Sequence, residues 1–421
     1  MSSIRMKGFK ETMKVDDSLR KFLKEFKEKK LDKEVIDLKN SLNRILAEDI
    51  VATIDIPPFD RAAMDGYAVK AEDTYGAFED NPIRLKLLGR IEAGEMASIE
   101  VHKGEAVEIA TGAPIPKGAN AVEMVEYTRK IDDRTIEVFK QITPSENVSK
   151  IGEDVKKGDL LLKTGVRLKP YDLGMLASLG ISRIKVFKRL RVGVLSTGSE
   201  LVELGAPLEP GKIINSNRIM ISAMVEELGG IPVDLGIAGD SLDEIKNKLI
   251  DGLKKSDLII ITGGTSVGEK DLVAEAINSI GKPGMIVHGV SIRPGMPTGL
   301  AIVEGKPIAS LSGYPVAAIV GFIALVRPII IKMLNTNEEP LPRIKATMSR
   351  RIASPIGVKS FVRVLVEKVG DKYFANPLRT TGSGVLSSLV KANGILIIPE
   401  NKEGVDTGEE VEVILTRHIE E

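Results

Sequence analysis

Three short, largely apolar runs separated by amphipathic segments most constrain what this chain can fold into. The runs cover residues 192–195, 233–237 and 258–261. Such runs are typical of strands buried on both faces, whereas the segments between them carry apolar residues at helical spacing. An alternation of strands and helices predicts a doubly wound parallel sheet covered by helices on both faces. We assign this α/β domain to residues 191–336.

Residues that typically begin helices lie after these runs, where a parallel sheet requires connecting helices. Asn217 can cap one helix, and Ser241 with Glu244 forms a capping-box pattern before the next. Asp271 starts a third helix, and Pro315 opens a long apolar helix that ends near residue 334. Each start favours a helix on the return path between two parallel strands.

The rest of the chain divides into three further parts. Apolar spacing predicts helix over residues 16–46, and short alternating strands with Gly and Pro turns follow over residues 51–141. We therefore expect a β lid module, residues 51–141, inserted into a helical and extended connector made of residues 1–50 and 142–190. After a polar linker, residues 337–421 predict a small β domain, so the fold class is multidomain α/β plus β.

Composition excludes several classes of function. The chain has no cysteine and three histidines far apart in sequence, which excludes thiolate sites and argues against a His-rich metal centre. We interpret the histidines as structural or surface residues. Lys plus Arg and Asp plus Glu are both 59, so no global basic field attracts nucleic acid. The longest apolar run is too short to span a membrane, and the N-terminus lacks a secretory pattern, so we expect a cytoplasmic protein.

Carboxylates follow the predicted parallel strands. Glu200, Asp240 and Asp271 come after the first, second and third strand, and the carboxyl ends of parallel strands meet at one edge of a sheet. Carboxylates are the ligands that Mg²⁺ prefers, so these three side chains could hold Mg²⁺ against phosphate oxygens. Alternatively, Glu200 is a surface residue and Asp271 a helix cap.

Small-residue turns lie at the same predicted edge. The third strand leads into a Gly-Gly-Thr-Ser-Val-Gly loop, residues 263–268, that can bring backbone N–H groups close to an anion. It matches neither a Walker A motif nor a dinucleotide fingerprint, and it could be an ordinary tight turn. Residues 293–299 and 310–315 form two Pro- and Gly-rich turns with the same two interpretations.

An ordered series of motifs resembles the molybdopterin molybdenumtransferase family, which includes the gephyrin E domain. The motifs are P-P-F-D-x-x-A-M-D-G-Y-A at 57–68, T-G-A-P-x-P at 111–116, G-E-D at 152–154, L-A-S-L-G at 176–180, S-T-G-x-E-L at 196–201, N-x-N-R at 215–218 and G-G-x-S-V-G-x-x-D at 263–271. Together they cover nearly the whole chain.

The resemblance implies a fold, a partner and a reaction. The implied molecule is an elongated homodimer, with the active cleft between the α/β domain of one subunit and the lid module of the other. The implied reaction uses Mg²⁺ to cleave adenylylated molybdopterin, inserts molybdate or tungstate into the dithiolene, and releases AMP. No nucleic acid or membrane is involved.

The resemblance also implies site residues. The implied catalytic residues are Asp65, Thr111, Glu200, Asp240 and Asp271, of which Glu200, Asp240 and Asp271 would organise the metal. The substrate-binding residues that we expect are Ser196, Thr197, Gly198, Gly263, Gly264, Ser266, Gly268, Arg293, Pro294, Gly295, Pro297, Ser312, Gly313 and Pro315.

Two positions depart from the family pattern. Met296 stands where the family usually has Lys, and Tyr314 stands where it usually has Asn. Loss of a Lys removes a positive charge that would attract an oxyanion. Two alternatives therefore stay open: a molybdopterin adenylyltransferase, and a non-catalytic scaffold or pterin-binding protein.

Overall fold

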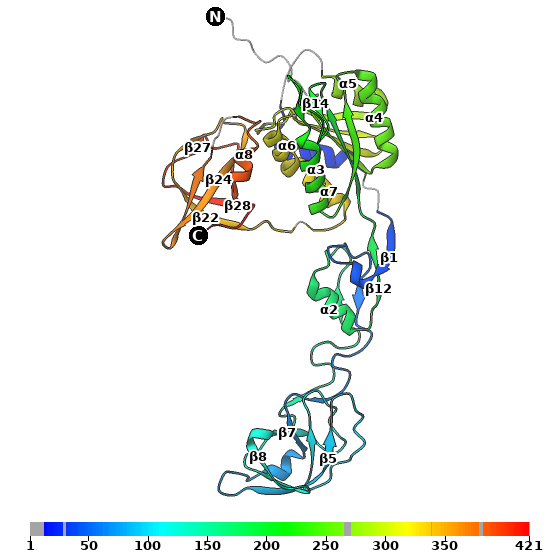
Figure 1. Ribbon diagram of the computed structural model, residues 1–421, viewed down its shortest axis with the longest axis vertical. Coiled ribbons are helices and arrows are strands. Elements are labelled where there is room, and N and C mark those ends of the chain that lie inside the picture. The colour runs from blue at the N-terminus through cyan, green and yellow to red at the C-terminus, as the bar shows by residue number, and fades with distance from the viewer. Residues whose placement is uncertain (1–11, 28–30, 265–270, 338, 379–381, 421) are drawn as a thin grey trace, which may run out of the picture.

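Figure 1 shows four folded parts arranged as an elongated molecule, in a computed structural model that describes residues 12–27, 31–264, 271–337, 339–378 and 382–420. The α/β domain lies between the C-terminal β domain on one side and the connector on the other. The connector leads to the lid module, which lies at the far end of the molecule from the α/β domain. This arrangement decides which of the expected site residues can meet within one chain.

The central sheet confirms the predicted parallel core and adds two strands that pair antiparallel. Its order is β16-β13-β17-β21-β20-β18, and the first four strands are parallel. β20 runs antiparallel to β21, because a two-residue turn with positive φ at Glu304 and Gly305 joins them directly. β18 pairs antiparallel with β20, so β18 runs in the same direction as the first four strands. The strands are β13 (Arg191–Thr197), β16 (Ile231–Ala238), β17 (Leu258–Thr262), β18 (Pro283–His288), β20 (Gly299–Val303) and β21 (Lys306–Leu311).

Helices cover both faces of this sheet, as the doubly wound prediction requires. Side chains alternate along the strands, so Val194 and Ile260 enter one buried cluster while Leu195 and Ile261 enter the other. The first cluster includes α3, α6 and α7, and the second includes α4 and α5. The helices are α3 (Ser216–Glu227), α4 (Leu242–Lys255), α5 (Leu272–Ile280), α6 (Pro315–Gly321) and α7 (Arg327–Met333).

The long apolar helix is continuous from Pro315 to Met333, with a π-helical turn, η4 (Phe322–Val326), between α6 and α7. Pro328 lies in the first turn of α7, and the wider π turn comes directly before this residue that lacks an N–H group. Among the described helices this is the one long and apolar enough to cross a membrane, yet 72% of its most apolar stretch is buried inside the protein. It therefore packs as a core helix.

The N-terminal segment differs from the prediction. A helix, α1 (Val15–Glu25), is present, but it buries Val15 and Phe22 in the core of the α/β domain, so residues 15–25 do not belong to the connector. The helix predicted to continue to residue 46 is wrong. β1 (Lys33–Asp37) and the 3-10 turn η1 (Leu38–Asn40) stand there instead, because β1 pairs with β12 (Arg183–Phe187).

The connector is a small unit with its own core. Leu46, Leu168 and Leu176 are buried in it together with side chains of β12. Two short paired strands continue toward the lid module. The remaining connector elements are β2 (Ile50–Val51), β11 (Leu160–Leu162) and α2 (Pro170–Ser178).

The lid module is a six-stranded sheet with the order β7-β4-β6-β5-β9-β8. Both faces of this sheet are apolar, because buried clusters lie on each side. The main strands are β4 (Gly66–Val69), β5 (Ile83–Ile91), β6 (Glu105–Ile109), β7 (Ala121–Met124), β8 (Thr128–Asp132) and β9 (Thr135–Val138). Smaller elements are β3 (Arg61–Ala62), η2 (Ala71–Thr74), η3 (Val125–Tyr127) and β10 (Val148–Ser149).

The C-terminal domain is a closed β-barrel, because β24 pairs with both β25 and β26. Its sheet also includes β19 (Ile292–Arg293), which comes from the turn region of the α/β domain and pairs with β24. The other elements are β22 (Arg343–Met348), β23 (Ile352–Ala353), β24 (Lys359–Val369), β25 (Lys372–Pro377), α8 (Ser387–Lys391), β26 (Gly394–Ile398), β27 (Gly404–Val405) and β28 (Glu410–Leu415).

Candidate functional site

The carboxyl edge of the parallel strands gathers the turns that the sequence singles out. β13 leads to Gly198 and Glu200, β16 leads to Asp240, and β17 leads to Gly263. Because β13 lies between β16 and β17, these three turns are neighbours in space. We call this edge, with the turns after β13, β16, β17 and β21, the rim.

Asp240 ties two turns of the rim together. Its Oδ2 accepts hydrogen bonds from the Ser199 hydroxyl at 2.6 Å and from the Ser199 backbone N–H at 3.0 Å. These bonds stabilise the charged form, so they lower the pKa of Asp240 below its usual value. Asp240 is therefore a carboxylate at neutral pH.

Glu200 directly follows Ser199 in the turn after β13. Its carboxylate is folded over Gly198, where a Cβ atom would come within 2.5 Å of Oε2. Gly198 also has a φ of +143°, which favours glycine. The turn therefore holds the Glu200 carboxylate beside Gly198, next in the chain to the Ser199 that binds Asp240. The ribbon formed by β14 (Leu201–Val202) and β15 (Ile213–Ile214) continues from this turn.

Asp271 is a helix cap and also contacts a histidine. Its Oδ1 accepts a hydrogen bond from the Ala274 N–H at 3.0 Å, at the start of α5. Its Oδ2 lies 3.0 Å from Nε2 of His288 at the end of β18. The capping alternative is thus confirmed for Asp271, and His288 is an exposed residue, as interpreted, that contacts this cap.

These carboxylates do not form a metal site by themselves. Among the residues that the structure describes, no three or more His, Cys, Asp or Glu side chains are grouped so that they could hold a metal ion. Mg²⁺ at phosphate sites is commonly bound by one or two carboxylates together with substrate oxygens. The donor set therefore fits a cation shared with a phosphate, and does not fit a cation held by the protein alone.

Glycines allow the rim turns to approach one another closely. A Cβ on Gly263 would lie 2.3 Å from the Thr197 carbonyl oxygen, and one on Gly264 would lie 2.5 Å from Thr197 Oγ1. Gly313, after β21, packs against Gly263, since its Cβ would lie 3.3 Å from Gly263 Cα. The structure thus brings together Thr197, Gly263, Gly264 and Gly313. Ser266 and Gly268 of the expected loop lie outside the described residues.

Buried polar atoms without partners mark the same region. Among the described residues, Thr197 Oγ1, Asn215 Nδ2 and Asn217 Oδ1 are buried and have no hydrogen-bond partner. Asn217 Nδ2 donates to the Gly313 carbonyl oxygen at 2.7 Å, which places Asn217 beside the turn after β21. Buried polar groups without partners are rare, so these atoms are candidates to bind a polar ligand. Ser196, which is buried, contacts Asn215 and Thr262 through its hydroxyl.

Asn215 and Asn217 were not among the expected site residues. Asn217 was predicted to cap α3, but Asn215 is the cap, because its side chain accepts the Arg218 N–H. The signal available in the sequence was the Asn-x-Asn-Arg motif, which places two amides where a short strand meets a helix. Spacing alone could not show that both amides face the turns after β13 and β21.

The two Pro- and Gly-rich turns also lie together. The Thr298 hydroxyl donates to the Gly295 carbonyl oxygen at 2.6 Å, which closes the turn. A Cβ on Gly295 would lie 3.2 Å from the Ala317 carbonyl oxygen, so this turn packs against α6, which begins at Pro315. Residues 293–298 and 312–315 are therefore neighbours, and they bring the expected Arg293, Pro294, Gly295, Pro297, Ser312, Gly313 and Pro315 to one region.

The C-terminal domain reaches this region as well. Arg293 pairs with Ser360 of β24, and the Val316 N–H donates to the Ser383 carbonyl oxygen at 3.0 Å. Arg363, three residues after Ser360, is 4% exposed, and its Nε donates to Ser388 Oγ at 3.2 Å. Burial lowers the pKa of the Arg363 guanidinium. Arg363 was not among the expected site residues, although a charged residue within an apolar run was a visible signal.

The expected lid residues are close to each other and far from the rim. Asp65 Oδ1 accepts hydrogen bonds from the Thr111 N–H at 2.7 Å and from the Thr111 hydroxyl at 2.8 Å. These bonds lower the pKa of Asp65, and both residues are exposed. Figure 1 places the lid module at the opposite end of the chain from the α/β domain. One chain therefore does not unite the two halves of the expected site.

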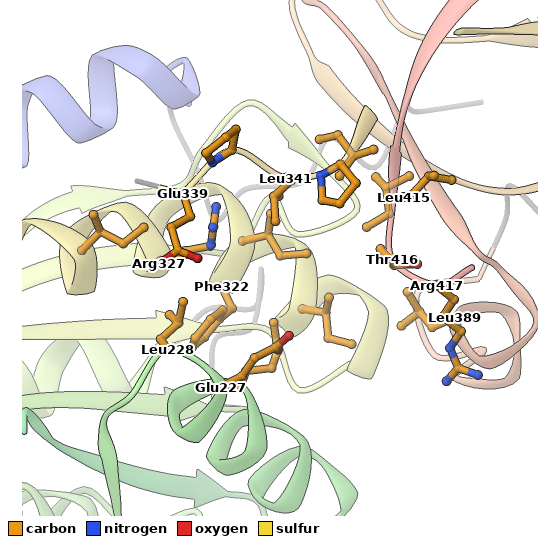
Figure 2. Close-up of a pocket in the computed structure, with 18 of the residues that line it drawn as sticks. Glu227, Leu228, Phe322, Arg327, Glu339, Leu341, Leu389, Leu415, Thr416 and Arg417 are labelled. Carbon is orange, nitrogen blue, oxygen red and sulfur yellow. The ribbon is translucent and has the colours of Figure 1, made fainter. Parts of the chain in front are cut away.

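A cavity of about 970 Å³ lies apart from the rim, between the α/β domain and the C-terminal domain. Figure 2 shows Glu227 and Leu228 of the α3 end, Phe322 of η4 and Arg327 of α7 on one side, and Leu415 of the barrel on the other. None of the expected site residues lines it. We therefore separate this cavity from the candidate site.

Three family models match this chain, and together they include residues of all four folded parts. A family model described as MoeA N-terminal region (domain I and II) matches residues 13–180, one described as probable molybdopterin binding domain matches 193–332, and one described as MoeA C-terminal region (domain IV) matches 345–416.

Two curated relatives and one solved structure illustrate the similarity. A putative molybdopterin biosynthesis protein of Methanocaldococcus jannaschii is 45% identical over 390 residues, covering 91% of this chain and 92% of the relative. A molybdopterin molybdenumtransferase of Bacillus subtilis is 37% identical over 393 residues, covering 93% and 91%. The crystal structure of a molybdopterin biosynthesis MoeA protein from Pyrococcus horikoshii OT3 superposes with a TM-score of 0.83 at 37% identity, covering 96% of this chain and 100% of that one.

Proposed function

Because this chain belongs to the molybdopterin molybdenumtransferase family, we propose that it cleaves adenylylated molybdopterin and inserts molybdate or tungstate into the dithiolene, with release of AMP. It is an enzyme of molybdenum-cofactor biosynthesis, as its curated relatives are named. Since the similarity runs through the lid module and the C-terminal domain, it favours this reaction over adenylyl transfer, and the names of the curated relatives favour it over a scaffold role. We propose a cytoplasmic location.

The observation that carries the proposal is the convergence of the rim turns around unpartnered polar atoms. Thr197, Asn215 and Asn217 offer buried donors and acceptors beside the closely packed Gly263 and Gly313. A pterin has ring nitrogens, an amino group and a carbonyl oxygen, so a buried set of mixed donors and acceptors suits it.

We propose Mg²⁺ as the cofactor. One or two of Glu200, Asp240 and Asp271 would hold it together with substrate phosphate oxygens, and the bound ion would neutralise charge on the pyrophosphate link. The side chains themselves carry the remaining work. Asp240 is ionised and fixed by Ser199, so it can orient a water molecule toward phosphorus. Cleavage adds one water across the P–O–P link, which leaves molybdopterin phosphate and AMP.

An oxyanion subsite would lie where the C-terminal domain meets the Pro- and Gly-rich turns. Arg293 and the buried Arg363 lie on paired strands there and supply positive charge. Because Met296 offers no charge, these arginines would take a larger share of molybdate or tungstate binding.

The direct test is AMP release from adenylylated molybdopterin in the presence of Mg²⁺ and either oxyanion. We expect release that stops after chelation of divalent ions and returns when Mg²⁺ is added. We expect Asp240→Asn to lower kcat by about 100-fold or more, since it removes a charged group from the reacting phosphate. Wild-type protein that releases no AMP with either oxyanion contradicts the proposed function.

We further propose that the site is completed in a homodimer, with the lid module of one subunit over the rim of the other. The distance of the Asp65 and Thr111 pair from the rim of its own chain supports this. Mixing Asp65→Asn with Asp271→Asn tests it, because each mixed dimer then has one rim and one lid that are both intact. Random pairing makes half of the dimers mixed, so about one quarter of wild-type activity should return. No recovery, with subunit exchange verified, contradicts a shared site.

A further inference from the structure

His288 contacts a proposed site residue, Asp271, but has no role in the reaction proposed above. It ends β18, and its Nε2 lies 3.0 Å from Asp271 Oδ2, although the two residues are 17 positions apart. The Asp271 side chain is 12% exposed, whereas that of His288 is 39% exposed. The carboxylate is thus the more enclosed partner of the pair.

The contact with His288 fixes the orientation of the Asp271 carboxylate, which the capping hydrogen bond alone leaves free to rotate. The hydrogen bond from the Ala274 N–H engages Oδ1 and leaves the carboxylate free to twist about that bond. His288 engages Oδ2, and two anchors at the two oxygens fix the carboxylate plane. Each carboxylate oxygen can accept a second hydrogen bond or ligate a cation, so the remaining acceptor sites take defined directions.

His288 is itself held by the structure around the substrate turns. It pairs with Gly299 across β18 and β20, and the next N–H, of Gly289, donates to the Thr298 carbonyl oxygen at 3.1 Å. Gly299 and Thr298 directly follow the turn that begins at Arg293. The backbone at His288 is therefore joined to the end of this turn, while its imidazole contacts the cap of α5.

We infer that His288 is a positioning residue, which holds the Asp271 carboxylate in the orientation that the reaction at the rim requires. It acts through Asp271 and does not itself touch the reacting phosphate. The catalytic part of this inference rests on the proposed function, whereas the positioning of Asp271 does not. Two experiments keep these parts separate.

The first experiment measures hydrogen exchange of the Ala274 amide. His288→Phe keeps a ring but offers no donor, so the carboxylate twists more freely and Ala274 should exchange several-fold faster than in the wild type. His288→Gln places an amide N–H at a similar reach and should restore slow exchange. His102→Phe, on the exposed surface of the lid module, serves as the control and should change nothing. Equal exchange in His288→Phe and the wild type would overturn the inference.

The second experiment measures AMP release. Loss of a group that orients a catalytic or metal-binding side chain commonly costs on the order of 10- to 100-fold in activity. We expect this loss in kcat for His288→Phe, with KM nearly unchanged and with most activity restored in His288→Gln. Adding His288→Phe to Asp271→Asn should cost nothing further, because the residue acts through Asp271.

The outcomes of the second experiment separate the positioning role of His288 from the proposed reaction. Wild-type kcat in His288→Phe, or a full additional loss in the Asp271→Asn background, would overturn the positioning role. A wild-type protein without AMP release would contradict the proposed function, and the Ala274 exchange rates would then still decide whether His288 positions Asp271.

Discussion

At the scale of single residues, the rim depends on glycines that leave no room for a side chain. Gly264 has a φ of +66°, and a Cβ there would lie 2.5 Å from Thr197 Oγ1 and 2.6 Å from Val273 Cγ2. A small residue was predictable at this turn from the sequence. The contact of this glycine with Thr197 was not predictable, because Thr197 lies on a strand 67 positions earlier in the chain.

We predict that Gly264→Ala lowers both stability and substrate affinity. The backbone strain alone should cost about 1 kcal/mol, and displacement of Thr197 should add to it. Gly205→Ala is the matched control, because Gly205 has a φ of +88° and nothing lies within 4 Å of its Cβ position. Chemical denaturation and ligand titration should show a larger loss for Gly264→Ala. Equal losses would mean that the close contact with Thr197 has no effect.

A second residue of interest is buried in the lid module, away from the proposed chemistry. Glu123 on β7 has no exposed surface, and among the described residues neither of its carboxylate oxygens has a hydrogen-bond partner. Burial raises the pKa of Glu123 to about 7, with Lys140 and the Met124 N–H opposing the shift and Glu146 adding to it. Tyr67 lies directly opposite on β4.

This pKa predicts how lid stability changes with pH. The folded lid keeps the Glu123 proton up to about pH 7, whereas the unfolded chain loses it near its ordinary value of 4.5. The folded state binds more protons in this interval, so stability should fall as pH rises from about 5 to 7 and then level off.

We predict that Glu123→Gln removes this loss. A pKa raised from 4.5 to about 7 corresponds to about 3 kcal/mol, so the variant should raise the Tm of the lid at pH 8 by on the order of 10 °C. Thermal unfolding at several pH values measures it, with Glu126→Gln, at an exposed position nearby, as the control. A wild-type lid as stable at pH 8 as at pH 5 would show that Glu123 does not titrate in this range.

At the scale of elements, periodic patterns predicted α3, α4 and α5 correctly, because each helix buries one apolar stripe against the sheet. The same logic failed over residues 33–40. There β1 gains backbone partners from β12, about 150 residues away in sequence, and such pairing is invisible to a local pattern. The two-residue strand β19 was missed for the same reason.

Helix caps offer a comparison between a predicted and an observed contact. Ser241 and Glu244 were predicted to form a capping box, but the Ser241 side chain makes no cap hydrogen bond to α4. Asn215 does cap α3. We predict that Asn215→Ala costs about 1 kcal/mol in the free energy of unfolding, whereas Ser241→Ala costs a few tenths at most. Denaturant titration of both variants checks this, and equal costs would contradict the assignment of caps.

At the scale of the whole molecule, residue patterns predicted the order of the four parts, whereas the resemblance alone implied an elongated shape with the lid module away from its own rim. The motifs predicted that the lid module is inserted into the connector. The structure places Asp65 and Thr111 at the opposite end of the chain from the rim, because the connector with β1, β12 and α2 lies between them.

We predict that the lid module unfolds separately from the α/β domain. The connector, which has its own buried cluster, separates the lid module from the α/β domain, so the two cores lack a common packing interface. Calorimetry should resolve at least two transitions, and Glu123→Gln should shift one of them at pH 8 and leave the other in place. A single transition that moves as a whole would contradict this independence.

The pairing of β19 with β24 has a consequence for exchanging parts between relatives. The linker at residues 335–342 looks like a natural crossover point, yet a strand from before it completes the barrel that follows. A chimaera joined at that linker would combine one parent's β19 with the other parent's β24. Hybrid proteins of this family should therefore carry the two residues Ile292 and Arg293 with the barrel they came from.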